Sequence, residues 1–233
     1  METISLNGNG RIRVARTEIE VPHAGGVITQ VLPLVGPGNY QNVMGMISQE
    51  GLLRPTTGQT FSLVHLALQN PDEEHCKTIL SRLKNQYLWT STENLWGKED
   101  VIVYDNIDGN MPSDRKSLIT RMKDGDKSVR VVPYGFQTGS QSVSDLVKNP
   151  YITAQVGDLP SEVVAEVAKK VSKVQPYVYA LGPQTNDTKR YTAGVSGWND
   201  SRLIVIGYCV VNDDNGYASG VCRSAEGTSQ KNK

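Results

Sequence analysis

The sequence predicts an α+β domain in which helices pack on small antiparallel sheets. Short runs of β-branched and aromatic residues alternate with segments whose apolar residues recur at helical spacing. Turn-forming residues separate these runs at short intervals along the chain. No internal repeat or linker divides the 233 residues, so we expect one domain over residues 1–222, followed by a flexible tail at 223–233.

The expected elements follow from these patterns in chain order. The turn-forming sequence Gly36-Pro37-Gly38 ends the second β-rich run, and Asn70 with Pro71 predicts the N-cap and first position of a helix. Valines at helical spacing predict a further helix at 161–171. We expect strands at residues 10–21, 27–35, 87–90, 101–105, 129–134, 151–155, 177–181, 201–207 and 216–221, and helices at 60–69, 71–86, 113–122, 142–148 and 161–171.

Charge and hydropathy exclude several classes of protein. The chain carries 24 basic and 24 acidic residues, which is not the basic surface of a nucleic-acid-binding protein. No apolar run is long enough to span a bilayer, and the N-terminus lacks the apolar core of a secretory signal. We therefore expect neither a nucleic-acid partner nor membrane insertion.

Catalytic and cofactor motifs are absent from the sequence. It contains no phosphate-binding glycine loop, dinucleotide fingerprint, zinc-protease motif or nucleophile elbow, so we expect no enzyme, no cofactor and no metal site. Cys209 and Cys222 are expected to be buried or half-buried thiols on neighbouring strands, and a disulfide between them is the alternative. The loop at 212–216 is expected to be a polar hairpin turn; a calcium site that uses Asp213 and Asp214 is its alternative.

The segment 191–222 has an unusual composition. The chain contains 41 Lys, Glu, Gln and Met residues, and none of them falls among these 32 positions. A β-rich region avoids such helix-favouring residues, which is one explanation of the bias.

A resemblance supplies a second explanation. The framework of Arg190, Trp198, Arg202-Leu203, Gly207 and the run 216–221 (GYASGV) resembles the C-terminal part of the C-type lectin fold, formylglycine-generating-enzyme subtype. Residues 85–222 further resemble the variable proteins of diversity-generating retroelements, in particular those of archaeal viruses. In that family, reverse transcription randomises adenines, and the varied asparagine codons cannot become codons for Lys, Glu, Gln, Met or Trp.

The resemblance implies a C-type lectin-like domain with short antiparallel strands, two or more packed helices and irregular loops. It also implies a rigid frame that carries interchangeable side chains. The frame would consist of Arg190, Trp198, Arg202, Gly207, Gly216 and Tyr217. The glycines would supply unusual backbone angles and close approach, and Trp198 and Tyr217 would fill the core. The arginines would either hydrogen-bond loop carbonyls or lie solvated on the surface. The candidate variable, ligand-facing positions are Ser196, Asn199, Asp200, Ile204, Ile206, Tyr208, Cys209, Val210, Val211, Asp213 and Asn215, with Tyr208 as the expected anchor.

The expected function is therefore non-catalytic binding of a protein or glycan on a host cell surface, through a hypervariable C-terminal region. A viral protein of this kind would lie at the virion surface, as part of an attachment structure. The alternative is an oxidoreductase of the formylglycine-generating type on the same fold. That chemistry uses two cysteines a few residues apart, whereas Cys209 and Cys222 are thirteen positions apart.

Overall fold

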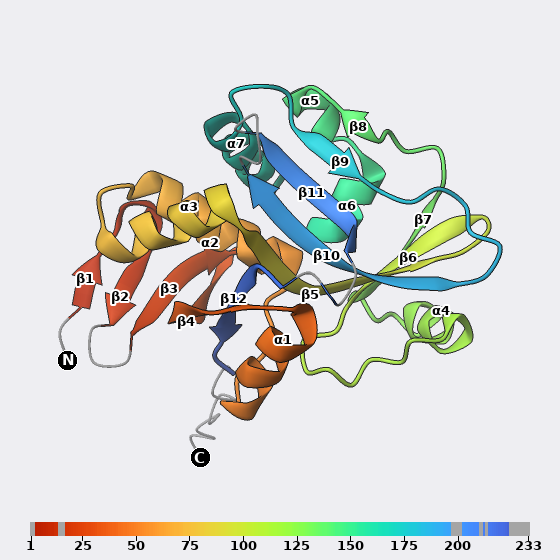
Figure 1. Ribbon diagram of the computed structural model, residues 1–233, viewed down its shortest axis with the longest axis horizontal. Helices are drawn as coiled ribbons and strands as arrows, with labels where there is room; N and C mark the ends of the chain where they lie inside the picture. The colour runs from red at the N-terminus through yellow and green to blue at the C-terminus, as the bar shows by residue number, and fades with distance from the viewer. Residues whose placement is uncertain (1–2, 14–16, 197–201, 210–211, 213, 224–233) are drawn as a thin grey trace, which may run out of the picture.

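A mixed sheet runs through the centre of the protein (Figure 1). The computed structural model describes residues 3–13, 17–196, 202–209, 212 and 214–223. Within them the strand order is β1-β2-β3-β4-β12-β5-β10-β11-β9-β8, and β6 and β7 continue from β5 as a branch. Most neighbours are antiparallel, but β12 runs parallel to β5 and β11 runs parallel to β9. The strands are β1 (Thr3–Ser5), β2 (Arg11–Arg13), β3 (Glu18–His23), β4 (Gly26–Gly38), β5 (Tyr87–Trp96), β6 (Asp100–Asp105), β7 (Val129–Pro133), β8 (Gly139–Ser140), β9 (Tyr177–Tyr179), β10 (Thr188–Ser196), β11 (Leu203–Cys209) and β12 (Gly216–Val221).

Polar side chains fix where the helices begin. Asn39 caps α1 by accepting a hydrogen bond from the Asn42 amide, and Thr56 with Gln59 forms a reciprocal capping box at α2. No helix in the described part of the chain is long and apolar enough to cross a bilayer. The helices are α1 (Tyr40–Gln49), α2 (Thr57–Gln69), α3 (Glu74–Asn85), α4 (Arg115–Lys123), α5 (Val143–Leu146), α6 (Pro150–Val156) and α7 (Ser161–Val171), with a short 3-10 turn, η1 (Asn7–Asn9).

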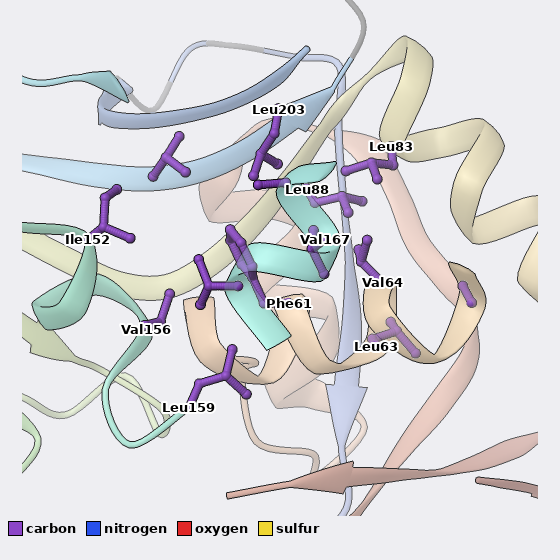
Figure 2. Close-up of a cluster of buried hydrophobic side chains, with 14 of the residues drawn as sticks. Phe61, Leu63, Val64, Leu83, Leu88, Ile152, Val156, Leu159, Val167 and Leu203 are labelled. Carbon is purple, nitrogen blue, oxygen red and sulfur yellow. The ribbon is translucent and has the colours of Figure 1, made fainter. Parts of the chain in front are cut away.

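The largest hydrophobic core lies between one face of the sheet and the helices α2, α6 and α7 (Figure 2). Phe61 and Val64 of α2 meet Val167 of α7 in this cluster, and Leu88 and Leu203 come from β5 and β11. Because successive residues of a strand point to opposite faces, Trp89 lies on the other side of the sheet from Leu88. This second face is covered in two places, by α1 over Trp89 and by α4 over a smaller cluster on β6 and β7.

The middle of β5 is polar although it is buried. The side chains of Thr90, Ser91, Thr92, Glu93 and Asn94 are at most 1% exposed. They make hydrogen bonds to elements far away in the sequence, as when the Asn94 amide donates to Thr192 Oγ1 of β10 at 2.7 Å. Since a buried polar group without a partner is costly, these bonds tie β5 to its neighbours specifically.

Several sequence expectations are confirmed by the structure. The α+β class is correct, the helix at 161–171 and the strand at 216–221 have the predicted bounds, and the helices at 60–69 and 113–122 are found within a few residues of theirs. The predicted tail at 223–233 lies outside the described residues, apart from Arg223.

Other expectations are wrong. Residues 151–155 are helical, because the Asn149 side chain accepts from the Tyr151 amide and Pro150 occupies the first helical turn. Gly36-Pro37-Gly38 are the last three residues of β4 and not a turn after Val35, and Asn70 ends α2 instead of starting α3. Residues 212–216 do not close a hairpin, since β11 pairs with β9 and β10 whereas β12 pairs with β4 and β5. Cys209 and Cys222 therefore do not lie on neighbouring strands, and the structure shows no disulfide between them.

Candidate ligand-binding surface

A cluster of tyrosines lies on β9 and β11, on the face of the sheet opposite the main core. Ile206 is paired with Tyr179 across these parallel strands, and Tyr208 lies on the same face of β11 as Ile206. The ring centroids of Tyr177 and Tyr179 are 4.2 Å apart, and those of Tyr179 and Tyr208 are 5.9 Å apart with the rings nearly perpendicular. We call Tyr177, Tyr179, Ile206 and Tyr208 the tyrosine surface.

Because side chains alternate between the two faces of a strand, the tyrosine surface is accessible whereas the opposite face is buried in the main core. On β9, Val178 is 1% exposed whereas Tyr179 is 36% exposed. On β11, Leu203 and Val205 belong to the main core, whereas Ile206 and Tyr208 are half-buried. Burial raises the pKa of Tyr208, so its phenol is a neutral hydrogen-bonding group at pH 7. Half-exposed aromatic rings with a hydroxyl tip are well suited to contact a partner.

Close contacts between glycine positions and buried side chains hold β11 and β12 in place. A Cβ on Gly207 would lie 1.7 Å from Tyr151 Oη, and a Cβ on Gly216 would lie 1.8 Å from Trp89 Nε1. The indole of Trp96 donates to the Gly207 carbonyl at 3.2 Å, and that of Trp89 donates to the Gly38 carbonyl at 3.0 Å. The predicted close approach is thus present at both glycines, but neither has a positive φ, so the expectation of unusual backbone angles is wrong.

The predictions for the other frame residues are confirmed only in part. Tyr217 is buried in the main core, as expected, with the Arg82 guanidinium 4.5 Å from its ring centre. Arg190 donates to the carbonyl of Lys189, which is in a strand and not in a loop. Arg202 lies 5.8 Å from the Tyr177 ring centre, so this cation borders the tyrosine surface. Trp198 lies outside the described residues.

The predicted ligand-facing positions divide into three groups. Ile206 and Tyr208 are half-buried on the tyrosine surface, and Asn215 is exposed after β11. Ile204 and Cys209 are only 8% and 4% exposed, so the prediction that they face a ligand is wrong for this structure. The side chain of Ser196 and the whole of Asn199, Asp200, Val210, Val211 and Asp213 lie outside the described residues.

The burial of Cys209 has a packing explanation. It ends β11 opposite Tyr191 and joins the cluster of Tyr40, Met44 and Trp89 beneath α1. The Sγ of Cys222 instead lies 4.0 Å from Glu18 Oε1. The two thiols thus have different surroundings, one beneath α1 and the other beside Glu18.

A buried carboxylate that the sequence does not predict lies in the middle of β5. Glu93 is 1% exposed, and its Oε1 accepts from Tyr40 Oη at 3.1 Å and Asn106 Nδ2 at 3.0 Å. Lys189 Nζ of β10 lies 2.6 Å from its Oε2. Burial, followed by the nearby Glu93 charge, raises the pKa of the Tyr40 phenol well above its usual range. The only sequence signal of this site is a glutamate inside a strand flanked by two tryptophans.

Metal ligands do not gather in the described part of the chain. No group of three or more His, Cys, Asp or Glu side chains is placed to hold a metal ion there. Of the two acids considered for calcium, Asp214 is exposed and Asp213 is not described. The tyrosine surface itself consists of aromatic rings and one aliphatic side chain, with Arg202 at its border.

Comparison with known proteins identifies the fold of the chain. No family model matches the chain, and no curated protein matches it. A solved structure described as "Accommodation of massive sequence variation in Nanoarchaeota by the C-type lectin fold" is similar, with a TM-score of 0.53 and 12% sequence identity. The likeness covers 79% of this chain and 93% of the other. The chain therefore has the C-type lectin fold.

Proposed function

We propose that this chain is a non-catalytic binding protein whose tyrosine surface contacts a protein or glycan ligand. The observation that carries the proposal is the Tyr177–Tyr179–Tyr208 cluster, which is half-exposed on strands whose other face is fully packed. Clustered tyrosines provide contact area at a low cost in conformational entropy. Exposed apolar and aromatic groups that lie together usually mark a binding surface.

We further propose that a retroelement diversifies the segment 191–222. The C-type lectin fold supports this, since the similar solved structure is described as accommodating massive sequence variation. The frame supports it as well, because Gly207 and Gly216 are held by Tyr151 and Trp89 and not by the side chains of the tyrosine surface. A viral owner of the gene would use such a surface for attachment to a host cell, from the surface of the virion.

The genomic test of diversification is direct. The region around the gene is sequenced and searched for a near-copy of codons 191–222 that differs only at adenines and lies beside a reverse transcriptase gene. We expect to find both. If neither is present, diversification is ruled out as the source of the compositional bias, and the β-strand preference alone explains it.

A binding test addresses the surface itself. Labelled protein is applied to a glycan array and to intact candidate host cells, next to the Tyr179→Ala, Tyr208→Ala and Val27→Ala variants. Val27 is 59% exposed at the start of β4 and serves as the matched control. We expect each tyrosine substitution to weaken binding about tenfold or more, as for aromatic anchors at interfaces. Equal binding by all four proteins would contradict the proposed surface.

A further inference from the structure

One edge of β7 has no strand beside it in the part of the chain that the structure describes. β7 is the last strand of the branch that leaves β5, and its only partner there is β6 (Figure 1). An unpaired edge presents main-chain N–H and C=O groups that can bond to a further strand. The tyrosine surface lies on β9 and β11, so this edge is a separate feature of the molecule.

The pairing of β7 with β6 shows which main-chain groups face the free edge. The Asp105 amide donates to the Ser128 carbonyl at 3.0 Å, just before β7 begins. Bonded and non-bonded pairs alternate along antiparallel strands, so Arg130 and Val132 are the residues of β7 that bond to β6. The residues between and beside them direct their N–H and C=O groups to the free edge.

These outward-facing residues are Val129, Val131 and Pro133. The Val129 amide already donates to the Asp126 carbonyl at 3.2 Å, and a proline has no N–H. The free edge therefore offers one donor, the Val131 N–H, and three acceptors, the carbonyls of the three residues. None of these four groups bonds to another main-chain or side-chain atom among the described residues.

A cleft of about 850 Å³ between β7 and α6 reaches this edge. Every residue from Lys127 to Pro133 lines it. The side chains of Val129 and Val131 pack near Leu118 of α4 on the other face of β7, so it is their main chain that borders the cleft. The donor and the acceptors of the free edge are thus accessible from the cleft.

The wall opposite the edge is apolar. It consists of Pro150, Ala154 and Val156 of α6, and Val132 of β7 lines the same space. Side chains of a strand alternate between its two faces, so every second side chain of a strand added to β7 would lie in this cleft. At about 3.3 Å per residue, the edge is long enough for about five to seven residues of such a strand.

The charges around the cleft favour an acidic partner over a basic one. Arg130 is paired with Asp105 at 2.7 Å, which leaves Lys127 and Lys148 against Asp158. His23 also lines the cleft; burial lowers its pKa, an effect that Asp158 only partly opposes, so the ring is neutral at pH 7. One positive charge is therefore in excess, and a nearby carboxylate of a bound segment would be attracted to it.

We propose that the free edge of β7 binds an extended segment of a partner protein by β-strand addition. The segment forms four main-chain hydrogen bonds, with the Val131 N–H and with the carbonyls of Val129, Val131 and Pro133. It carries apolar side chains at alternate positions, which lie against α6, and an acidic residue. In this mode of recognition the main-chain bonds supply affinity and the side-chain cleft supplies specificity.

A synthetic peptide tests the edge on the whole chain. The probe is a capped heptapeptide in which valine alternates with threonine and one threonine is replaced by glutamate. Amide NMR locates its binding, and hydrogen exchange reports on the Val131 N–H, which has no partner among the described residues of the free protein. We expect the peptide to shift the amide signals of β7 and to slow exchange at Val131 about tenfold or more.

Two substitutions at one position separate the main chain from the side chain. Val131→Pro removes the outward N–H and keeps the bonds of β7 to β6, since proline is tolerated on edge strands. Val131→Ala keeps the N–H and shortens the side chain. We expect Val131→Pro to weaken peptide binding about tenfold, and Val131→Ala to bind within about twofold of the unmodified protein. Tyr208→Ala, which alters only the tyrosine surface, should bind as the unmodified protein does.

Two altered peptides give a test that does not depend on the folding of Val131→Pro. The fully N-methylated peptide has the same side chains but no N–H donors, and we expect it not to bind. The peptide with lysine in place of glutamate should bind about threefold more weakly than the original.

Several results would overturn the proposal. They are the absence of peptide binding at β7, equal affinity of Val131→Pro and Val131→Ala, and equal affinity of the original and the N-methylated or lysine peptide. Loss of peptide binding in Tyr208→Ala would place the peptide on the tyrosine surface instead. A dimer in sedimentation experiments that Val131→Pro abolishes would assign the edge to a second copy of this chain, and would overturn the proposal as well.

Discussion

Gly207 of β11 packs directly against the hydroxyl of Tyr151 in α6, where a Cβ on the glycine would lie 1.7 Å from Oη. The tyrosine cannot withdraw, because it is fully buried and its hydroxyl donates to Asn94 Oδ1 at 3.2 Å. The strand that carries Tyr208 is thus fixed from behind by a contact that has no room for any other residue.

We expect Gly207→Ala to lower the free energy of unfolding by about 2–3 kcal/mol, because the added methyl group forces a shift of Tyr151 or of β11. Gly45→Ala is the matched control: Gly45 is inside α1, and a Cβ there would meet no atom within 4 Å. That substitution should stabilise the protein by about 0.5–1 kcal/mol. Urea unfolding of both variants checks the signs, and a neutral Gly207→Ala would refute the packing account.

If β11 is a rigid frame that carries interchangeable side chains, a surface position of this strand should tolerate substitution and a core position should not. Tyr208→Asn should change the free energy of unfolding by about 1 kcal/mol or less, since the ring is half-buried at the surface. Leu203→Ala should cost about 3 kcal/mol, since Leu203 is 2% exposed in the main core. Thermal and urea unfolding measure both. A Tyr208→Asn variant as unstable as Leu203→Ala would show that the tyrosine belongs to the frame.

Local sequence patterns predict the elements whose conformation is determined by residues close together in the chain. The valines of α7 recur at helical spacing, and the helix has the predicted bounds, Ser161–Val171. Residues 151–155 have the β-branched and aromatic residues of a strand, but the preceding Asn149-Pro150 caps them as a helix. The helix α1 carried a comparable signal, with Asn39 as N-cap ahead of the spaced apolar residues Val43 and Ile47.

The site could be predicted only in part, because its members meet through strand pairing over long distances in sequence. The residue type alone predicts Tyr208 as the anchor of the proposed surface, but Tyr177 and Tyr179 join it only through the parallel pairing of β9 with β11. The burial of Cys209 likewise depends on α1, which packs there from more than 150 residues earlier in the chain. Pairing of this kind leaves no periodicity in one sequence.

Because the buried Glu93 forms an ion pair with Lys189, we expect the removal of one of the two charges to lower the free energy of unfolding strongly. In Lys189→Met the carboxylate of Glu93 stays 1% exposed without its cation, and we expect a loss of about 3 kcal/mol in the free energy of unfolding. The double variant Lys189→Met, Glu93→Gln should recover part of that loss, because no buried charge is left unpaired. If the changes in unfolding free energy of the two single variants simply add up in the double variant, the two residues are not coupled and the prediction is contradicted.

Cys76 predicts a specific dependence of stability on alkaline pH. Burial, followed by the nearby Glu73 carboxylate, raises the pKa of this thiol from 9.0 to about 12. The unfolded chain therefore loses the thiol proton first, so the stabilising contribution is complete below pH 9 and is lost as the pH rises toward 12. Across that window we expect the unmodified protein to lose about 1 kcal/mol per pH unit more than Cys76→Ala does.

The comparison isolates the thiol, because the buried tyrosines titrate alike in both proteins. Urea unfolding at a series of pH values from 8 to about 11 measures the difference in slope. Thiol labelling at pH 8 gives an independent reading: Cys222 is half-buried and should react in the folded protein, whereas Cys76 should react only as the chain unfolds. Equal slopes for the two proteins, or rapid native-state labelling of Cys76, would show that the thiol is not held protonated by its surroundings.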